Sequence, residues 1–316
     1  MNLYTSGSRY LFLFLIIFAT YIGVSLWSQT YIVHHHLLRD NDLLLSIQLD
    51  KIKHSKSVEI AFVGDSSLGN SIDARLVEKM TGKKTINAAL TGSFGVQGSL
   101  NMARRIYQNN RKSLRTIVLM QSLWGPTLDV DWVAYYDTKC LLCSKGATSL
   151  IEDMSSQRSF SNYLGEFVNS YFNRNYVAAR VDVIRNGAPK SKIVWDSTLD
   201  YFTQGAPMNL GVENMTPRSG TDIQAENMFF LHRFEQFCME AKLTCLYAHG
   251  PLYSGYLSRL GLFVADVNKT ISEHFSRGIS AEPYPLSNND AGDSWDHTRP
   301  ASKRLTTAYY VEKLRL

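Results

Sequence analysis

The sequence predicts an α/β fold, a three-layer sandwich with a central parallel sheet, preceded by one transmembrane helix. Three observations support this prediction. From Val58 onward, short apolar runs alternate with helical stretches, which favours a parallel sheet covered on both faces. Small polar residues directly follow several of these runs, as at the carboxyl ends of strands. Tyr10 to Val33 carries no charge and is long enough to span a bilayer as a helix.

The composition is that of a folded protein with a sizeable core. The chain has 316 residues, of which 45% are hydrophobic and 19% charged. The formal net charge of +5 is spread without a long Lys/Arg run, so we expect no nucleic-acid partner. We also expect no metal and no cofactor.

Residues 1–33 are predicted to form an uncleaved N-terminal membrane anchor. Tyr10, Tyr21 and Trp27 suit positions at the membrane interfaces. A cleaved signal peptide is the alternative, but the apolar run is long and no clean small-x-small site follows it. Residues 34–56 are polar with spaced leucines, which favours an amphipathic stalk helix.

Residues 57–316 are predicted to form the catalytic domain. The strands are expected at Val58–Val63, Thr85–Ala88, Leu114–Met120, Lys192–Trp195 and Leu243–Ala248. The helices are expected at Asp73–Met80, Gln97–Asn109, Asp222–Ala241, Val267–Phe275 and Pro300–Leu314. An insertion at about 124–189 breaks the alternation, and it is either a lid or partner-binding element or an excursion with a structural role.

Four cysteines fit an oxidising compartment. Cys140 and Cys143 form a C-x-x-C, while Cys238 and Cys245 flank an expected helix-to-strand turn. Of the three possible pairings, the local one is favoured. A zinc site made of all four is the alternative, but only one pair has C-x-x-C spacing.

The candidate catalytic residues are Ser66, His297 and Asp293. Ser66 follows the first expected strand in Gly-Asp-Ser, and His297 lies in a C-terminal segment with Asp293 four residues before it. A serine hydroxyl becomes a good nucleophile when a histidine takes its proton and a carboxylate orients that histidine. Asp296 is the alternative orienter. We prefer Asp293 because an adjacent side chain rarely reaches its neighbour's Nδ1, and we expect Asp296 to cap the final helix.

Three further polar residues lie in or after expected strands. Asp65 is expected to bond local backbone amides. Asn87 is a candidate supporting residue in the second strand. His249, at the end of another strand, either contacts substrate or supports the site, or else is a buried structural histidine, which we favour.

These motifs, in this order, resemble the SGNH (GDSL-type) hydrolase superfamily, from Val58 to the end without the insertion. The resemblance implies a flavodoxin-like sandwich with Ser66 as the nucleophile. It also implies an oxyanion hole built from the backbone amides of Ser66 and Gly92, the latter ending the stretch Asn87 to Gly92. The family's third block ends in an asparagine that this chain lacks, and Gln121 is the nearest amide.

The anchor, the stalk, the stretch Gly64 to Asn70 and the final Asp-His-x-x-Pro resemble the membrane-anchored envelope branch of that family. This branch includes the D-alanyl transfer protein of teichoic acids and the alginate O-acetylation proteins. The resemblance implies a catalytic domain outside the cytoplasm and a multi-pass membrane-bound O-acyltransferase as partner. The expected function is O-acyl transfer to a cell-surface glycan or glycolipid through an acyl-serine. The alternatives are an esterase and a non-catalytic scaffold.

Overall fold

The computed structural model describes residues 3–34, 40–128, 138, 172, 174–186, 194–195, 202–203 and 222–316. The chain divides into two compact units, which are described separately below. The first unit comprises Met1–Leu43 and Ala147–Ser191, and the second comprises Leu44–Gly146 and Lys192–Leu316.

The second unit is built on a five-stranded sheet whose neighbouring strands are all parallel. Its order is β2-β1-β3-β6-β8. The strands are β1 (Ile60–Gly64), β2 (Thr85–Ala89), β3 (Thr116–Gln121), β6 (Thr244–His249) and β8 (Ile279–Ala281). This is the flavodoxin-like order, so the predicted fold class is confirmed.

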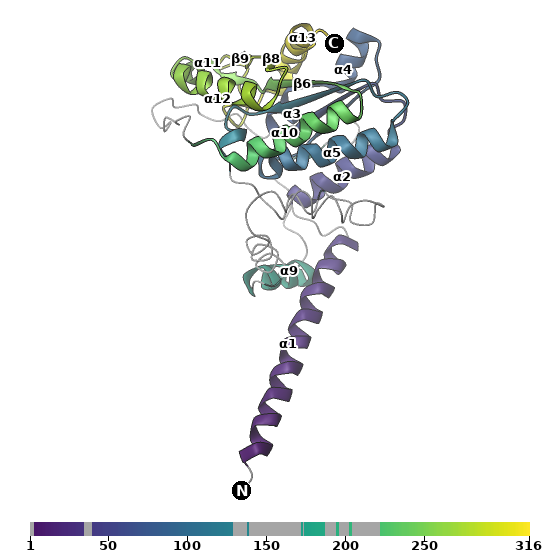
Figure 1. Cartoon of the computed structure of the whole chain (residues 1–316), viewed down its shortest axis with the longest axis vertical. Coiled ribbons are helices and arrows are strands. Elements are labelled where there is room, and N and C mark those ends of the chain that lie inside the picture. Colours follow the sequence, from purple (N-terminus) through teal and green to yellow (C-terminus); the bar gives the residue numbers. More distant parts are fainter. Residues whose placement is uncertain are drawn as a thin grey trace. The chain divides into compact units, whose positions relative to one another are not determined.

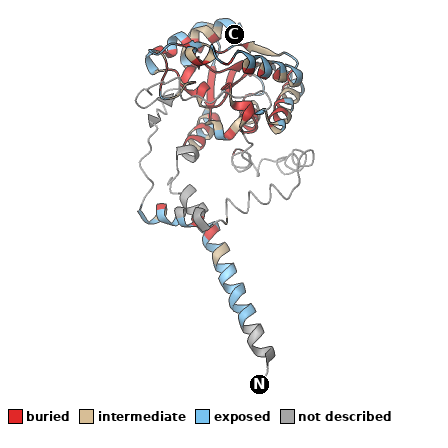
Figure 2. Cartoon of the chain, turned by 90° about the vertical axis from the view of Figure 1, so that its left-hand side faces the viewer, coloured by how far each residue is buried: buried red, intermediate tan, exposed pale blue. Residues whose placement is uncertain are grey.

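Helices cover both faces of the sheet (Figure 1). On one face lie α5 (Gly95–Asn109) and α10 (Ala225–Glu240), with α12 (Gly261–His274) against α10. On the other face lie α3 (Ser66–Ser71), α4 (Ala74–Thr81) and α13 (Lys303–Leu314). Figure 2 shows the strands as the buried layer between them. Because both faces are covered, β1 is buried throughout and reads as a continuous apolar run.

Helix α2 (Asp40–His54) covers the free edge of β2. Its Leu44 and Ile52 are buried. The Gln48 side-chain amide donates to the Ala89 carbonyl at 2.8 Å, and the Lys51 ammonium donates to the Asn87 carbonyl. Edge strands carry unpaired backbone groups. The part of the expected stalk from Leu44 onward therefore belongs to the folded unit.

Two regular elements of the first unit are described. Helix α1 (Leu3–His34) holds a span from Tyr10 to Ser28 that is long and apolar enough to cross a membrane. Figure 2 shows its middle exposed. Helix α9 (Arg174–Asn186) lies within the expected insertion and packs against α1, where the Tyr21 hydroxyl donates to the Phe172 carbonyl.

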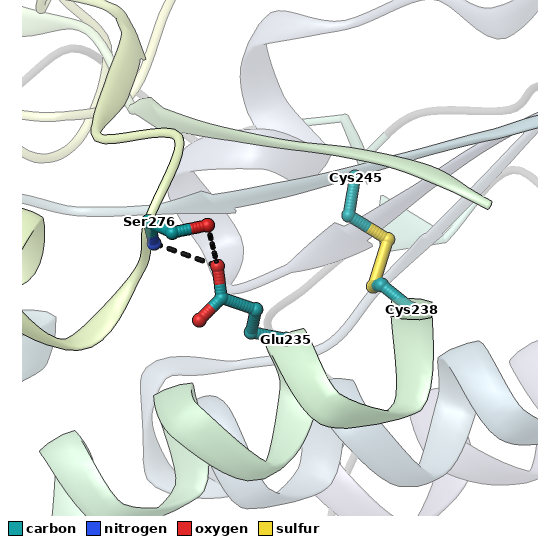
Figure 3. Close-up of a disulfide and its surroundings, with 4 residues drawn as sticks. All are labelled: Glu235, Cys238, Cys245 and Ser276. Carbon is teal, nitrogen blue, oxygen red and sulfur yellow. Dashed lines mark hydrogen bonds between the residues drawn. A yellow bond between two sulfur atoms is a disulfide. The ribbon is translucent and has the colours of Figure 1, made fainter. Parts of the chain in front are cut away.

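A disulfide joins Cys238, near the end of α10, to Cys245 in β6 (Figure 3). This pair confirms the local pairing expected for these two cysteines and removes them as zinc ligands. Cys140 and Cys143 lie outside the described residues. In the same figure, Glu235 of α10 accepts hydrogen bonds from the backbone and hydroxyl of Ser276, which follows α12.

The structure corrects two expectations about the strands. The expected strand at 192–195 is the two-residue β4 (Val194–Trp195), which pairs antiparallel with β5 (Phe202–Thr203) outside the central sheet. The fifth strand of the sheet is instead β8. It is only three residues long, and its sequence Ile-Ser-Ala has little apolar pattern to mark it. The remaining expected strands and helices are present with shifted ends.

Candidate active site

Ser66 directly follows β1, at the point of the sheet where successive strands change from being added on one side of β1 to being added on the other. From β1 the chain crosses to β2 on one side, and then returns past β1 to β3 on the other. Ligands of open parallel sheets bind at such a switch point, beyond the carboxyl ends of the strands. Gly64 ends β1 there, and a Cβ on it would lie 1.7 Å from the Met120 carbonyl oxygen of β3. Only glycine allows this approach of the two strands.

Asp65 fixes the backbone on both sides of the switch point. It is the N-cap of α3, and its Oδ1 accepts hydrogen bonds from the Ser67 backbone at 3.0 Å and the Ser67 hydroxyl at 2.5 Å. Its Oδ2 accepts from the backbone N–H of Ser122, after β3, at 2.7 Å. The expectation that Asp65 bonds local amides is therefore met by Ser67, and the bond to Ser122 extends it.

Burial shapes the electrostatics of Asp65. The carboxyl is fully enclosed, and desolvation together with the negative charge of Asp296 raises its pKa, against the lowering effect of its hydrogen bonds.

A Cβ at Gly250, after β6, would lie 2.1 Å from the Ser67 hydroxyl oxygen, so this neighbour too must be glycine.

The structure brings together Ser66, His297 and Asp293. The Ser66 Oγ lies 2.9 Å from His297 Nε2, and His297 Nδ1 lies 2.8 Å from Asp293 Oδ1. In the neutral ring, the carboxylate selects the tautomer with the proton on Nδ1. Nε2 is then the basic nitrogen, and it faces the Ser66 hydroxyl. This is the geometry that activates a serine nucleophile.

The loop that carries His297 is held by its own backbone. The Gly292 N–H donates to the His297 carbonyl at 2.7 Å, and Ala291 forms a β-bridge with Thr298. The Thr298 hydroxyl lies 3.1 Å from that of Ser71, which ends α3. The nucleophile helix and the histidine loop are thereby joined directly.

Asp296 occupies a different position from the one expected. It does not cap the final helix, which begins after the short helix η5 (Pro300–Ser302) and has Ser302 as its N-cap residue. Its carboxylate accepts from the Ser294 hydroxyl at 2.6 Å and lies 3.7 Å from His297 Nε2. Asp293 is therefore the carboxylate on Nδ1, and Asp296 lies near the nitrogen that faces Ser66.

These carboxylates set the charge of the imidazole. Burial alone lowers the pKa of His297, but the charge of Asp296 and the hydrogen bond and charge of Asp293 raise it above its ordinary value, with a smaller contribution from Asp65. The hydrogen bond from His297 lowers the pKa of Asp293. Asp293 therefore stays ionised to lower pH than an ordinary aspartate, and its charge favours the protonated form of His297.

The expected oxyanion hole consists of the backbone amides of Ser66 and Gly92. Ser66 is the first residue of α3, and Gly92 is the first residue of the short helix η1 (Gly92–Phe94). The N–H of a first helical residue has no partner within its own helix. Gly92 follows β2, whose Ala89 lies opposite Gly64, and the Leu90 N–H donates to the Gly64 carbonyl at 2.9 Å. Both amides thus follow the ends of adjacent strands.

Gln121 is bound elsewhere. Its side-chain nitrogen donates to the Ser99 hydroxyl of α5 at 3.0 Å, and the residue is buried. The geometry therefore gives no support to Gln121 as a third oxyanion donor. Asn87 is also buried; it donates to the Ile72 carbonyl after α3 and accepts from the Ala89 N–H, which makes it a support for the backbone between α3 and β2.

His249 is fully buried, and burial lowers its pKa. Its Nε2 donates to Asn268 Oδ1 at 2.8 Å, because the Asn268 amide nitrogen donates to Glu282. The Tyr310 hydroxyl donates to the His249 carbonyl. These contacts agree with the favoured interpretation of a structural histidine.

No signal in the sequence marks Ser122. What Ser122 contributes is the backbone N–H that donates to Asp65, and any residue except proline supplies such a group.

Comparisons with known proteins do not identify a function for this chain. No family model matches the chain, and no curated protein matches it. Among solved structures, an acetyl xylan esterase (Est2A) from the rumen bacterium Butyrivibrio proteoclasticus is 12% identical with a TM-score of 0.35. The alignment covers 83% of this chain and 64% of that one, so this chain spans less than two thirds of its length.

A second solved structure is a carbohydrate esterase whose active site displays divergent catalytic and non-catalytic binding functions. It is 10% identical with a TM-score of 0.36, over 83% of this chain and 69% of that one. Both TM-scores are below 0.5, so neither likeness carries weight for activity.

Proposed function

We propose that this protein is a membrane-anchored, extracytoplasmic serine acyl-ester enzyme that transfers an acyl group to a hydroxyl of a cell-surface glycan or glycolipid. The observation that carries the proposal is the continuous chain of contacts from Ser66 Oγ through His297 to Asp293, with heavy-atom distances of 2.9 and 2.8 Å. These distances lie within the range required for proton transfer between a nucleophile and its base.

In the first half-reaction, Ser66 Oγ attacks the carbonyl carbon of the acyl donor while its proton moves to His297 Nε2. The backbone amides of Ser66 and Gly92 stabilise the tetrahedral oxyanion. The donor's leaving group departs with the proton returned by His297, which leaves an acyl ester on Ser66. In the second half-reaction, His297 takes the proton of the acceptor hydroxyl, and the acceptor oxygen attacks the acyl-serine. Ser66 leaves and recovers its proton.

The membrane and the partner enter as parts of the same proposal. The apolar span in α1 would anchor the chain, with the catalytic unit outside the cytoplasm. A multi-pass membrane-bound O-acyltransferase would deliver the acyl group from the cytoplasmic side. The oxidising compartment that the Cys238–Cys245 disulfide requires supports this location.

Hydrolysis is the second candidate, and one observation favours it. The Asp293 side chain is 42% exposed, so water reaches the edge of the site. Transfer and hydrolysis share the acyl-serine and differ only in the acceptor. The segment expected to exclude water, about 124–189, lies mostly outside the described residues.

The experiment that tests the proposed chemistry uses the full chain in detergent with 4-nitrophenyl acetate. Ser66→Ala, His297→Ala and the double variant should each lose about 10³-fold or more in kcat/KM, and the double variant should lose little more than either single variant, because the two residues act as one unit. Near wild-type turnover by Ser66→Ala would exclude the mechanism. Incubation with a donor ester and the glycan, followed by mass spectrometry of the glycan, separates transfer from hydrolysis.

A further inference from the structure

The loops around Ser66 and His297 also carry five aromatic side chains in mutual contact. We define the aromatic row as Phe263, Trp124, Tyr256, Trp295 and Tyr253, in order of contact. Trp124 comes directly after β3 of the central sheet, and Trp295 lies in the loop that carries His297. The other three follow β6, in β7 (Leu252–Tyr253), α11 (Ser254–Leu257) and α12.

The rings hold one another in place. The Trp124 ring centroid lies 4.9 Å from that of Tyr256 and 6.1 Å from that of Phe263. The Trp295 centroid lies 6.2 Å from that of Tyr256 and 5.9 Å from that of Tyr253. The Tyr253 N–H also donates to the Trp295 carbonyl at 2.8 Å. Each indole is therefore supported by two rings, and Tyr256 contacts both indoles.

Burial divides the row into supports and a surface. Tyr256, Phe263 and Tyr253 are 6%, 3% and 8% exposed, so these three rings form a base within the protein. Trp124 and Trp295 are only half-buried. Fixed indoles that keep part of their surface accessible are typical of binding sites, since their order is established before the ligand arrives.

The two indoles belong to the same loops as residues that hold or form the proposed site. Trp295 is two residues from both Asp293 and His297 in the sequence, and the loop backbone is fixed by its own hydrogen bonds. Trp124 is two residues after Ser122, whose N–H is held by Asp65 beside the nucleophile. A molecule resting on the indoles is thus brought to the loops that hold Ser66 and its base.

We propose that Trp124 and Trp295 form the binding platform for the acceptor, and that the acceptor is a chain of uncharged pyranose rings. The C–H face of a pyranose is apolar and slightly positive, so it suits the negative face of an indole, while its hydroxyl groups remain directed outward. The carboxylates of Asp293 and Asp296, which lie within two residues of Trp295 in the sequence, disfavour an anionic sugar. The assignment as acceptor site rests on the proposed acyl transfer, but binding itself does not.

The first test measures protection in the unmodified full chain in detergent. Cellohexaose, chitohexaose and mannohexaose are added as probes, with a hexamer of an anionic uronic acid as the contrasting ligand. Tryptophan oxidation by N-bromosuccinimide is then followed residue by residue by mass spectrometry. At least one neutral hexamer should slow the oxidation of Trp124 and Trp295 several-fold, while Trp27 in α1 reacts at its original rate. Protection by none of the neutral hexamers, or stronger protection by the anionic one, would overturn the proposal.

The second test uses matched variants. Trp124→Leu and Trp295→Leu should weaken binding of the protecting hexamer at least tenfold, and Trp124→Phe and Trp295→Phe should retain more of it, because an aromatic face remains. Tyr107→Leu is the control. Tyr107 is a half-buried ring in the last turn of α5, and among the described residues its ring contacts Phe237, at a centroid distance of 5.7 Å. Equal loss in the Leu and Phe variants, or in the Tyr107 control, would show that the row only supports the fold.

A third measurement separates this proposal from the proposed function. Ser66→Ala should bind the same hexamer with unchanged affinity, since Ser66 contacts the acyl group rather than the platform. If Ser66→Ala remained an active esterase but the indoles were still protected, the catalytic proposal would fail while the platform stood. If Ser66→Ala were inactive and the hexamers gave no protection, the platform proposal would fail while the catalytic proposal stood.

Discussion

The Oδ2 atom of Asp65 accepts a 2.7 Å hydrogen bond from the backbone N–H of Ser122. The two residues are 57 positions apart in the sequence. The other carboxylate oxygen of Asp65 caps the nucleophile helix through Ser67. One buried side chain therefore joins the loops after β1 and β3, and the position of Ser66 relative to the sheet depends on it.

Replacing Asp65 by alanine should destabilise the protein more than removing an ordinary helix cap. Asp65→Ala leaves two buried N–H groups without their acceptor, and each such group costs about 1–3 kcal/mol. Asp73→Ala is the matched control, because Asp73 caps α4 through the Arg75 N–H near the surface and its loss should cost about 1 kcal/mol. Thermal unfolding of the full chain in detergent measures both. Equal losses would contradict the role given to Asp65.

Replacing Asp293 and replacing Asp296, the two carboxylates beside His297, should lower activity to different extents and for different reasons. Asp293→Asn should lower kcat/KM for 4-nitrophenyl acetate by about 10²–10⁴-fold, because the carboxamide no longer holds the Nδ1–H tautomer or stabilises the imidazolium. Asp296→Asn should cost less, since Asp296 does not contact Nδ1. A larger loss in Asp296→Asn would reassign the orienting residue.

The pH profile provides a separate prediction for Asp296. The proposed mechanism requires neutral His297 as the base, so kcat/KM should rise as pH increases through the pKa of this histidine. Because Asp296 and Asp293 raise that pKa, the rise should be centred above the ordinary histidine value. Removing the charge in Asp296→Asn should move the rise to lower pH. A profile between pH 5 and 9 that does not shift would show that Asp296 has no electrostatic effect on the base.

The sequence allowed Ser66, His297 and Asp293 to be chosen as candidates because residue type and strand ends mark them, and the structure brings these three side chains together. Ser66 and His297 are 231 residues apart. Each was nevertheless found by its position, because Ser66 follows the first strand and His297 precedes the last helix. The contributions of Ser122 and of β8 could not be found this way. A backbone N–H leaves no mark on the residue that supplies it, and a three-residue edge strand is fixed by its neighbours. Strand alternation alone does not tell which helix the Gln121 amide meets, and the structure shows that this amide donates to Ser99 of α5.

Lys303 should make the stability of the fold depend on pH in the alkaline range. It is buried at the start of α13, and desolvation lowers its pKa to about 7, partly opposed by Asp73. Between pH 7 and the ordinary lysine value, the unfolded chain holds a proton that the folded chain has released, so stability rises with pH. Lys303→Met should therefore raise the melting temperature more at pH 6 than at pH 9. The exposed Lys313 in the same helix is the control, and Lys313→Met should show no such difference. An equal gain at both pH values would contradict this assignment.

The disulfide should contribute measurable stability despite its short span. Cys238 and Cys245 are seven residues apart, and closing a loop of this length is worth about 2–3 kcal/mol in the chain-entropy description. The Cys238→Ala/Cys245→Ala double variant should unfold at lower temperature than the oxidised protein. Reduced wild-type protein should approach the variant. If the reduced and oxidised proteins unfolded together, the bond would be dispensable for folding.

The contact between α2 and the last residues of β2 has a consequence under the proposed anchoring, which would hold many copies of the chain in one membrane. Proteins confined to a plane meet at high local concentration, and an open strand edge on each would invite pairing between neighbours. Gln48 and Lys51 occupy the outward carbonyls of Ala89 and Asn87, so this edge offers fewer acceptors to a second strand. In that proposed arrangement, the contacts of α2 would keep the β2 edges of neighbouring copies from pairing as crowding increases.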